Sequence, residues 1–147
     1  MIIREMQLDD LEQVMVIENE LFSVPWTENG FFSFLLREDA LFLVAEEEGK
    51  ILGYCGVLMV LDEGDITNVA VDKKQQGRGI GKKLIRHLIR VTGQAGVTTL
   101  HLEVRQSNAA AIALYEGQGF EKAGVRKNYY ESPAEDGILM CRKDGAC

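Results

Sequence analysis

Hydrophobic and polar positions along the chain follow two periods, one typical of strands and one typical of helices. In its first part the pattern predicts a short strand, two helices and a hairpin of two strands. These elements are the strand Met1–Glu5, a helix with apolar positions recurring from Leu11 to Phe22, a helix from Phe31 to Leu36, and the strands Leu41–Glu46 and Ile51–Leu61. The polar segment Glu48-Gly49-Lys50 between the last two strands is typical of a tight turn.

Two polar positions predict where the first two helices begin. Asp9 followed three residues later by Glu12 resembles a capping box, in which side chains bond to the free N–H groups of the first turn. Val24-Pro25-Trp26 then interrupts the helical pattern. Thr27 follows it, and threonine is a residue type that caps helix N-termini, so we expect the second helix to begin there.

The second half of the chain alternates strands with helices. After the polar segment Asp62–Asp65, the expected elements are the strand Ile66–Val71, a helix that follows Gly81 and ends at Gly93 and Gly96, the strand Leu100–Val104, a helix from Asn108 to Gln118 closed by Gly119, and the strands Phe120–Val125 and Gly137–Arg142. Hairpins open and close the chain, while helices connect its middle strands. The pattern therefore predicts one domain, residues 1–147, of the α/β or α+β class, with a mixed sheet covered by helices.

Composition favours a globular protein over the other classes. The chain has 147 residues, of which 46% are hydrophobic and 27% charged, too apolar for disorder as the main state. No apolar run approaches the roughly 20 residues of a membrane span, and no signal-peptide core is visible. Cys55, Cys141 and Cys147 are too few and too scattered for a disulfide framework or a zinc site. We expect a cytoplasmic protein with reduced thiols, no bound metal and no membrane contact.

One short basic segment lies in an otherwise acidic chain. Seven Lys and Arg residues and one acid occupy Asp72–Arg90, so this segment carries +6 while the whole chain carries −7. The rest of the chain therefore carries −13. The segment is either a solvated helix face or an anion site. Nucleic acid is not an expected partner, because the remaining surface would repel it.

Three glycines at alternate positions, Gly77, Gly79 and Gly81, stand at the start of the helix in this basic segment. Glycine permits positive φ and a close approach of a ligand, and the N–H groups and dipole of a helix N-terminus attract phosphate. The P-loop pattern fails, because Gln76 and Lys83 stand at its first glycine and at its hydroxyl residue. The dinucleotide pattern fails as well. An anion site of another kind and a flexible turn both remain open.

Two blocks of the chain resemble the GCN5-related N-acetyltransferases, the GNAT family. Gln76-x-x-Gly79-x-Gly81 is similar to the loop that holds the pyrophosphate of acetyl-CoA in that family, and Asn108–Phe120 is similar to its late block. The resemblance covers nearly the whole chain and implies a mixed, mainly antiparallel sheet with acetyl-CoA as cosubstrate. The residues that it assigns to acetyl-CoA are Val69, Ala70, Val71, Gly77, Arg78, Gly79, Ile80, Gly81, Lys82 and Asn108.

Glu103 and Tyr115 are the predicted catalytic residues. A carboxylate on a strand of a covered sheet needs a role or a partner, so Glu103 is either a base for the amine or an ion-pair partner of Arg105 or His101. Tyr115 follows Ile112 by three residues on one helix, so its ring is expected to pack inward. A phenol with a pKa of about 10 can protonate a departing thiolate, whose pKa is about 8.5, although a plain core aromatic fits the pattern too. The resemblance implies the acid role for Tyr115 and supports the base role for Glu103.

Shorter blocks resemble the GNAT branch whose members acetylate the N-terminal alanine of a small-subunit ribosomal protein. They are Pro25-Trp26-Thr27, Leu102–Arg105, Ser107-Asn108 and Arg126–Tyr130, while Gly137 departs from the alanine usual in that branch. The branch implies a basic N-terminal peptide as substrate, which suits the acidic body of the chain.

Three aromatic residues are candidates for the walls of the substrate groove. Trp26 and Tyr129-Tyr130 could line it, although Trp26 could equally be a core residue between the first two helices. The alternatives to the N-terminal substrate are an acetyltransferase for another amine and a non-catalytic coenzyme A-binding regulator. Glu103 and Tyr115 disfavour the regulator, because a degenerate site need keep neither.

Overall fold

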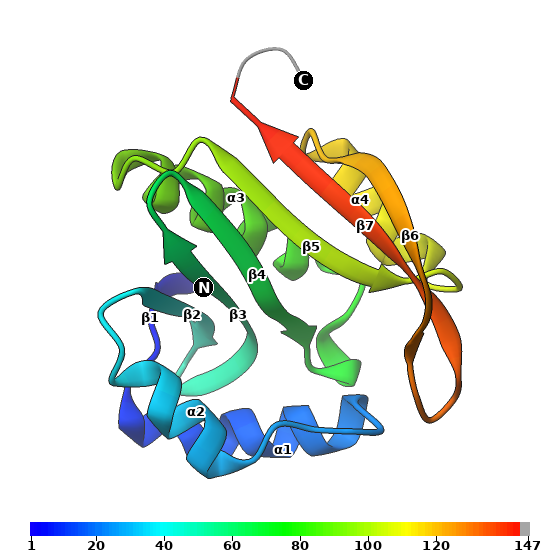
Figure 1. Ribbon diagram of the computed structural model, residues 1–147. Coiled ribbons are helices and arrows are strands. Elements are labelled where there is room, and N and C mark those ends of the chain that lie inside the picture. Colours follow the sequence, from blue (N-terminus) through cyan, green and yellow to red (C-terminus); the bar gives the residue numbers. More distant parts are fainter. Residues whose placement is uncertain (145–147) are drawn as a thin grey trace.

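The computed structural model describes residues 1–144, in which seven strands form one sheet and four helices cover it (Figure 1). The strands are β1 (Ile2–Glu5), β2 (Ala40–Glu47), β3 (Lys50–Val60), β4 (Glu63–Val71), β5 (Thr99–Arg105), β6 (Glu121–Tyr130) and β7 (Glu135–Lys143). The helices are α1 (Leu11–Leu21), α2 (Glu28–Leu35), α3 (Ile80–Gln94) and α4 (Ala109–Gly117), and short 3-10 turns cover Leu8–Asp10 and Lys73–Gln75.

The sheet has the strand order β1-β2-β3-β4-β5-β7-β6. Within residues 1–144 the pairing of β4 with β5 is parallel, and every other pair of neighbouring strands is antiparallel. This arrangement confirms the predicted α+β class and its mixed, mainly antiparallel sheet.

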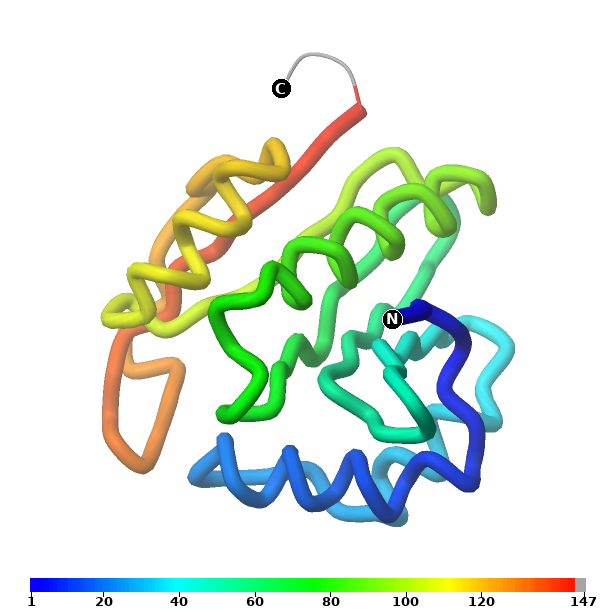
Figure 2. Tube along the Cα trace, turned by 180° about the vertical axis from the view of Figure 1, so that it is seen from behind, coloured from blue at the N-terminus to red at the C-terminus, as the bar shows by residue number. Residues whose placement is uncertain are grey.

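Helices cover both faces of the sheet. Helices α3 and α4 lie on one face, seen in front in Figure 2, while α1 and α2 pack on the opposite face of the N-terminal strands. Neighbouring residues of a strand therefore enter different cores: Leu43 packs with α3, and Val44 packs with α1 and α2. None of the helices described is long and apolar enough to span a membrane.

The two predicted helix starts have different outcomes. Thr27 Oγ1 accepts the N–H of Gly30 at 3.0 Å, which confirms the predicted cap of α2. The capping box predicted for Asp9 and Glu12 is wrong. Asp10 instead accepts the N–H of Gln7 at 2.7 Å and pairs with Arg4 at 2.8 Å, because a 3-10 turn precedes α1. Hydrogen bonds from the Arg4 guanidinium lower the pKa of Asp10.

Several element ends differ from the sequence pattern because tertiary pairing extends them. Strand β4 begins at Glu63 rather than Ile66, since residues 63–65 pair with strands on both sides. Helix α3 continues through Gly93 and stops before Gly96, whose φ is +94°. Strands β6 and β7 continue past the predicted ends and pair as far as Tyr130 opposite Glu135.

Strand β4 carries one extra residue relative to β3. Ile66 pairs with Val57 and Asn68 pairs with Gly56, so Thr67 forms a bulge. The bulge reverses the alternation of side chains along β4. Ile66 packs in the core beneath α3, whereas Ala70, an even number of positions later, packs in the core beneath α1 and α2.

We expect Gly56→Ala to destabilise the fold. A Cβ at Gly56 would lie 2.2 Å from Cε1 of the buried Phe42 ring. The ring must then shift, and overpacking of this kind lowers the free energy of unfolding by about 1–3 kcal/mol. The control is Gly93→Ala, because a Cβ there meets nothing within 4 Å and alanine favours a helix. Denaturant unfolding measures both variants, and equal stability of the two would contradict the prediction.

Candidate active site

Strands β4 and β5 pair over three positions and then separate. The paired residues are Glu63 with Thr99, Gly64 with Leu100 and Asp65 with His101, after which the strands diverge (Figure 1). A cavity of about 1150 Å³ lies at this divergence. Residues from the α1–α2 connection, β4, the loop before α3, β5, α4 and the β6–β7 hairpin line it.

The divergence leaves backbone groups of β4 without a strand partner. The N–H of Asp72 donates to the carbonyl oxygen of Leu52 on β3 at 2.8 Å. Amide directions alternate along an antiparallel pair, so the N–H groups of Val69 and Val71 point away from β3, toward β5. The carbonyl oxygen of Val71 accepts a hydrogen bond from Gln76 Nε2 at 3.2 Å, which holds the following loop against the end of β4.

The glycine-rich loop lines one end of the cavity. Gly77 and Gly79 have φ values of +87° and +76°, the left-handed region that favours glycine, and a Cβ on either would meet no atom within 4 Å. Gly79 is the N-cap of α3, so the first N–H groups of that helix are free of partners within the helix. At Gly81 a Cβ would lie 3.3 Å from Leu114 Cδ1, so glycine lets α3 approach α4 closely.

Every residue that the resemblance assigns to acetyl-CoA lines the cavity except Arg78. The Arg78 guanidinium donates to Gln75 Oε1 at 2.7 Å and to Glu47 Oε2 at 2.9 Å. Among the described Lys and Arg residues of the segment Asp72–Arg90, Lys82 is the one that lines the cavity. The basic side chains of the segment therefore do not act as one group at the site.

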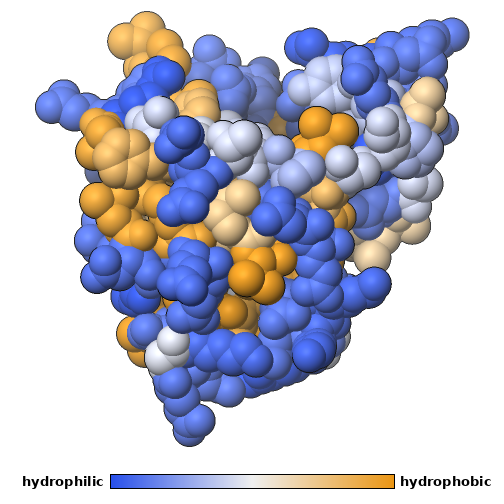
Figure 3. Space-filling model, turned by 90° about the horizontal axis from the view of Figure 1, so that it is seen from below, coloured by the Kyte–Doolittle hydropathy of each residue, from blue (hydrophilic) through white to orange (hydrophobic). Residues whose placement is uncertain are grey.

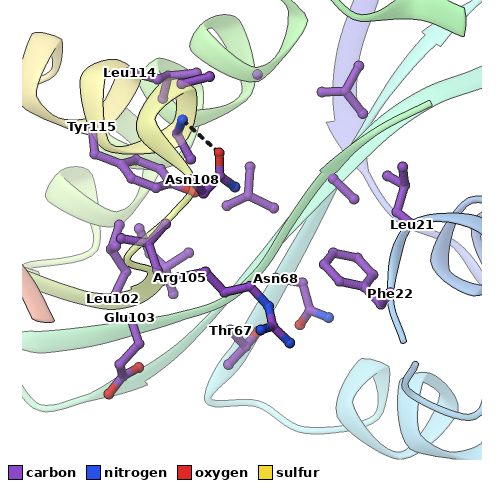
Figure 4. Close-up of a pocket in the computed structure, with 18 of the residues that line it drawn as sticks. Leu21, Phe22, Thr67, Asn68, Leu102, Glu103, Arg105, Asn108, Leu114 and Tyr115 are labelled. Atoms are coloured by element: carbon purple, nitrogen blue, oxygen red, sulfur yellow. Dashed lines mark hydrogen bonds between the residues drawn. The ribbon is translucent and has the colours of Figure 1, made fainter. Parts of the chain in front are cut away.

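Asn108 joins the cavity to α4. Its Oδ1 accepts the N–H of Ala111 at 3.1 Å, so it is the N-cap of α4, and this bond is the dashed line in Figure 4. The bond fixes the carboxamide plane and leaves the amide hydrogens of Nδ2 available to a ligand in the cavity.

Tyr115 has the inward orientation expected from its spacing. The residue is 7% exposed, lines the cavity, and packs edge to face on Phe120 with ring centroids 5.8 Å apart. Burial, and to a smaller extent the neighbouring Cys55 and Tyr130, raises the pKa of its phenol. The hydroxyl is therefore protonated throughout the neutral range and is available as a proton donor.

Glu103 lies on the other face of β5. Leu102 and Val104 pack in the core with Tyr115, and Glu103 points to the opposite side (Figure 4). Its side chain is 31% exposed, and Oε1 lies 3.8 Å from Arg126 Nε.

The two ion-pair partners predicted for Glu103 are wrong, because its ion-pair partner is Arg126. His101 Nε2 lies 3.0 Å from Glu63 Oε1, and Arg105 Nη1 lies 3.2 Å from Glu135 Oε1. Each of these two side chains thus contacts a carboxylate from a different strand. The long contact with Arg126 leaves the Glu103 carboxylate accessible from the cavity, which it lines.

Arg105 fixes the β6–β7 hairpin at the rim of the cavity. Its guanidinium lies 4.4 Å from the centroid of the Tyr130 ring and donates to the carbonyl oxygen of Pro133 at 2.9 Å. Hydrogen bonds from Ser107 and Arg105 lower the pKa of Glu135 in the same hairpin. Seen from below in Figure 3, the outline of this end is notched, and hydrophobic side chains gather among hydrophilic ones.

Trp26 is both a core residue and part of the cavity wall, the two positions that the sequence allowed. Its ring stacks on Phe34 at 4.8 Å and contacts Phe31 at 5.1 Å between centroids, and it also lines the cavity. Tyr130 lines the cavity too, and Tyr129 is 45% exposed beside it. The wall opposite the hairpin is therefore the outer side of an aromatic core.

Sequence reasoning missed the buried polar residues of the site. Glu18 is 2% exposed and accepts two hydrogen bonds, one from the Tyr54 hydroxyl at 2.6 Å and one from the backbone N–H of Trp26 at 2.9 Å. The second bond fixes the α1–α2 connection. Thr67 and Asn68 line the cavity from β4. The sequence did contain a sign of these buried residues, because each is a polar residue at a position where the periodicity predicts an apolar one.

Within residues 1–144, neither Cys55 nor Cys141 lines the cavity. Cys55 is buried, and burial raises the pKa of its thiol. Cys141 is partly buried, and Cys147 lies outside the described residues.

Comparison with known proteins identifies the family of this chain. Residues 11–120 match the model of the acetyltransferase (GNAT) family. The [ribosomal protein bS18]-alanine N-acetyltransferase of Escherichia coli K12 is 41% identical over 140 residues, which cover 94% of each chain. The enzyme of the same name from Salmonella typhimurium LT2 is 43% identical over 133 residues, 89% of each chain.

Solved structures agree with this relationship. The crystal structure of the ribosomal-protein-S18-alanine N-acetyltransferase from Escherichia coli superimposes with a TM-score of 0.91 at 39% identity, covering 99% of this chain and 95% of that one. A PaiA N-acetyltransferase from Thermoplasma acidophilum in complex with coenzyme A has a TM-score of 0.81 at 16% identity, covering 97% and 98%, a likeness of fold alone. The chain therefore belongs to the GNAT family of acetyltransferases, in the branch of the ribosomal-protein-alanine N-acetyltransferases.

Proposed function

We propose that this protein transfers the acetyl group of acetyl-CoA to the α-amine of an N-terminal alanine on ribosomal protein bS18. The observation that carries the proposal is the cavity between the diverging strands β4 and β5, which extends from the glycine-rich loop to the face of β5 that carries Glu103. The printed names of the relatives supply the substrate. We expect the reaction to take place in the cytoplasm, because ribosomal proteins are made there.

The cavity suits acetyl-CoA at two points. The open space beside Gly77 and Gly79, with the free N–H groups at the start of α3, fits a pyrophosphate. The N–H groups of Val69 and Val71 offer strand-like hydrogen bonds to an amide-containing arm, and Asn108 adds a side-chain donor. Arg78 contributes its backbone to this loop, while its side chain pairs with Glu47. We assign no metal to the reaction.

Acetyl-CoA supplies the thioester whose acyl carbon forms the new amide bond as its C–S bond breaks. Glu103 accepts the proton that the amine loses, directly or through a water, on one face of β5. Tyr115 lies on the other face and offers its hydroxyl proton to the departing sulfur, because a phenol is protonated at neutral pH. The N–H of Val69 or Val71 faces the oxygen on which negative charge develops.

Charge supports a basic peptide as the second substrate. Outside the segment Asp72–Arg90 the chain carries −13. Three acidic residues, Glu63, Asp65 and Glu103, lie together with His101 and Arg126 on the side of β5 from which we expect the amine to approach. An α-amine also suits a single carboxylate base, because its pKa is about 2.5 units below that of lysine. Deprotonating a lysine would cost the site about 3.4 kcal/mol more.

We expect Gly79→Asp to weaken the binding of acetyl-CoA sharply. The new carboxylate would lie where phosphate is expected, at a φ of +76° that asparagine and aspartate tolerate better than other residues. Gly79→Asn is the matched control, with the same shape and no charge. Calorimetry should give an affinity at least about tenfold lower for the Asp variant than for the Asn variant. Equal affinities would remove the loop from the phosphate site.

We expect Glu103→Gln to lower the rate most at low pH and to recover partly as pH rises. A base matters while the amine is protonated, and an α-amine loses its proton near pH 7.7–8.0 unaided. Glu63→Gln is the control, because it removes the same charge from the same acidic face outside the main cavity. The pH profile of kcat/KM distinguishes them. A Glu103→Gln profile parallel to that of the wild type would assign the base elsewhere.

We expect acetylation at the N-terminus of a basic peptide that begins with alanine. One peptide containing a lysine is compared in two forms, with its N-terminus free or blocked, and mass spectrometry locates the acetyl group. The free form should be modified at its terminus and the blocked form should react far more slowly. Acetylation of the blocked peptide on lysine at the rate of the free one would make this protein an acetyltransferase for a different amine.

A further inference from the structure

Two polar atoms in the cavity have no hydrogen-bond partner within residues 1–144. They are Thr67 Oγ1 and Asn68 Oδ1, both buried. Asn68 is 8% exposed, and the three residues that follow it on β4 are apolar. Leaving a buried acceptor unpaired costs stability, and a native structure that keeps one needs a reason. Both residues line the cavity (Figure 4), so a bound molecule can supply the missing donors.

The bulge at Thr67 determines which side of the sheet these atoms face. Without the extra residue Asn68 would follow Ile66 into the core beneath α3. With it, Asn68 shares the face of Ala70, on the side of α1 and α2. Glu103 occupies the same side of the sheet, because its neighbours Leu102 and Val104 face the other core. The unpaired acceptors and the proposed base therefore face one space.

Asn68 also stands next to the proposed point of reaction. The following residue, Val69, directs its N–H into the gap between β4 and β5, where the developing oxyanion is expected. An amine that attacks in this gap from the side of Glu103 passes the Asn68 side chain. Phe22, which follows α1, lies beside Asn68 in Figure 4 and also lines the cavity.

Resting on the proposed function, we propose that Asn68, with Thr67 beside it, binds the N–H groups of the attacking α-amine and makes the enzyme selective for primary amines. A neutral primary amine has two N–H donors and one lone pair. Two acceptors bind the donors and leave the lone pair directed into the gap. Both acceptors are uncharged, so they orient the amine without favouring its protonated form as a carboxylate would.

The role is one of positioning and specificity, distinct from proton transfer by Glu103. A secondary amine, such as N-methylalanine at the terminus, has one N–H and must place a methyl group against an unpaired polar atom. The wild-type enzyme should therefore discriminate against it. This discrimination should depend on Thr67 and Asn68, whereas a merely structural role would leave it unchanged.

The test compares two basic peptides that differ only in an N-terminal alanine or N-methylalanine. Asn68→Leu and Thr67→Val keep the side-chain shape and remove the acceptor, Asn68→Ala replaces the leucine variant if that one does not fold, and the exposed Asn29→Ala is the control. We expect Asn68→Leu to lower kcat/KM for the alanine peptide about tenfold and for the N-methylalanine peptide less than about threefold. Affinity for acetyl-CoA, measured by calorimetry, should stay at the wild-type value.

The outcomes separate this inference from the proposed function. If the wild type acetylates neither peptide, the N-terminal activity is wrong and this inference is wrong with it. In two other outcomes the wild type is active, while the Asn68 and Thr67 variants lower kcat/KM by the same factor for both peptides, or lower it for neither peptide. In either case the two residues do not bind the amine. A loss of acetyl-CoA affinity in the same variants would place them at the cosubstrate and would also overturn the assignment.

Discussion

The early end of the pairing between β4 and β5 is the constraint on which the site depends. Two neighbouring parallel strands normally satisfy each other's backbone hydrogen-bonding groups along their length. Here β4 pairs with β5 from Glu63 to Asp65, and the two strands then separate. Backbone N–H and C=O groups of β4 are then available inside the molecule, where they need partners. The cavity, its free amides and its access from both faces of the sheet all follow from this divergence.

The elements around the divergence hold it open from both sides. Gln76 bonds back to Val71 and places the glycine loop at the end of β4, while Gly81 lets α3 approach α4. On the other side, Arg105 holds the β6–β7 hairpin, and Glu18 holds the connection between α1 and α2. These contacts are far apart in sequence, so the walls of the cavity are a tertiary property.

The sheet separates two kinds of chemistry. Tyr115 lies in the apolar core with α3 and α4, where burial raises the pKa of its hydroxyl. Glu103 lies on the opposite face, partly exposed and beside other acidic groups. In the proposed mechanism, strand β5 lies between the two side chains, so each acts on a different end of the reaction.

Local patterns determined most of the elements, because a helix or strand leaves its period in the sequence. The glycine loop, the Thr27 cap, the hairpin at Gly49 and the apolar stripe of α3 were all readable, and so was the family. The sequence could not show that Arg78 turns to Glu47, that Glu103 faces Arg126, or that a bulge at Thr67 turns Asn68 toward the side of α1 and α2. These features depend on partners from other strands and on register, and only the folded chain brings those partners together.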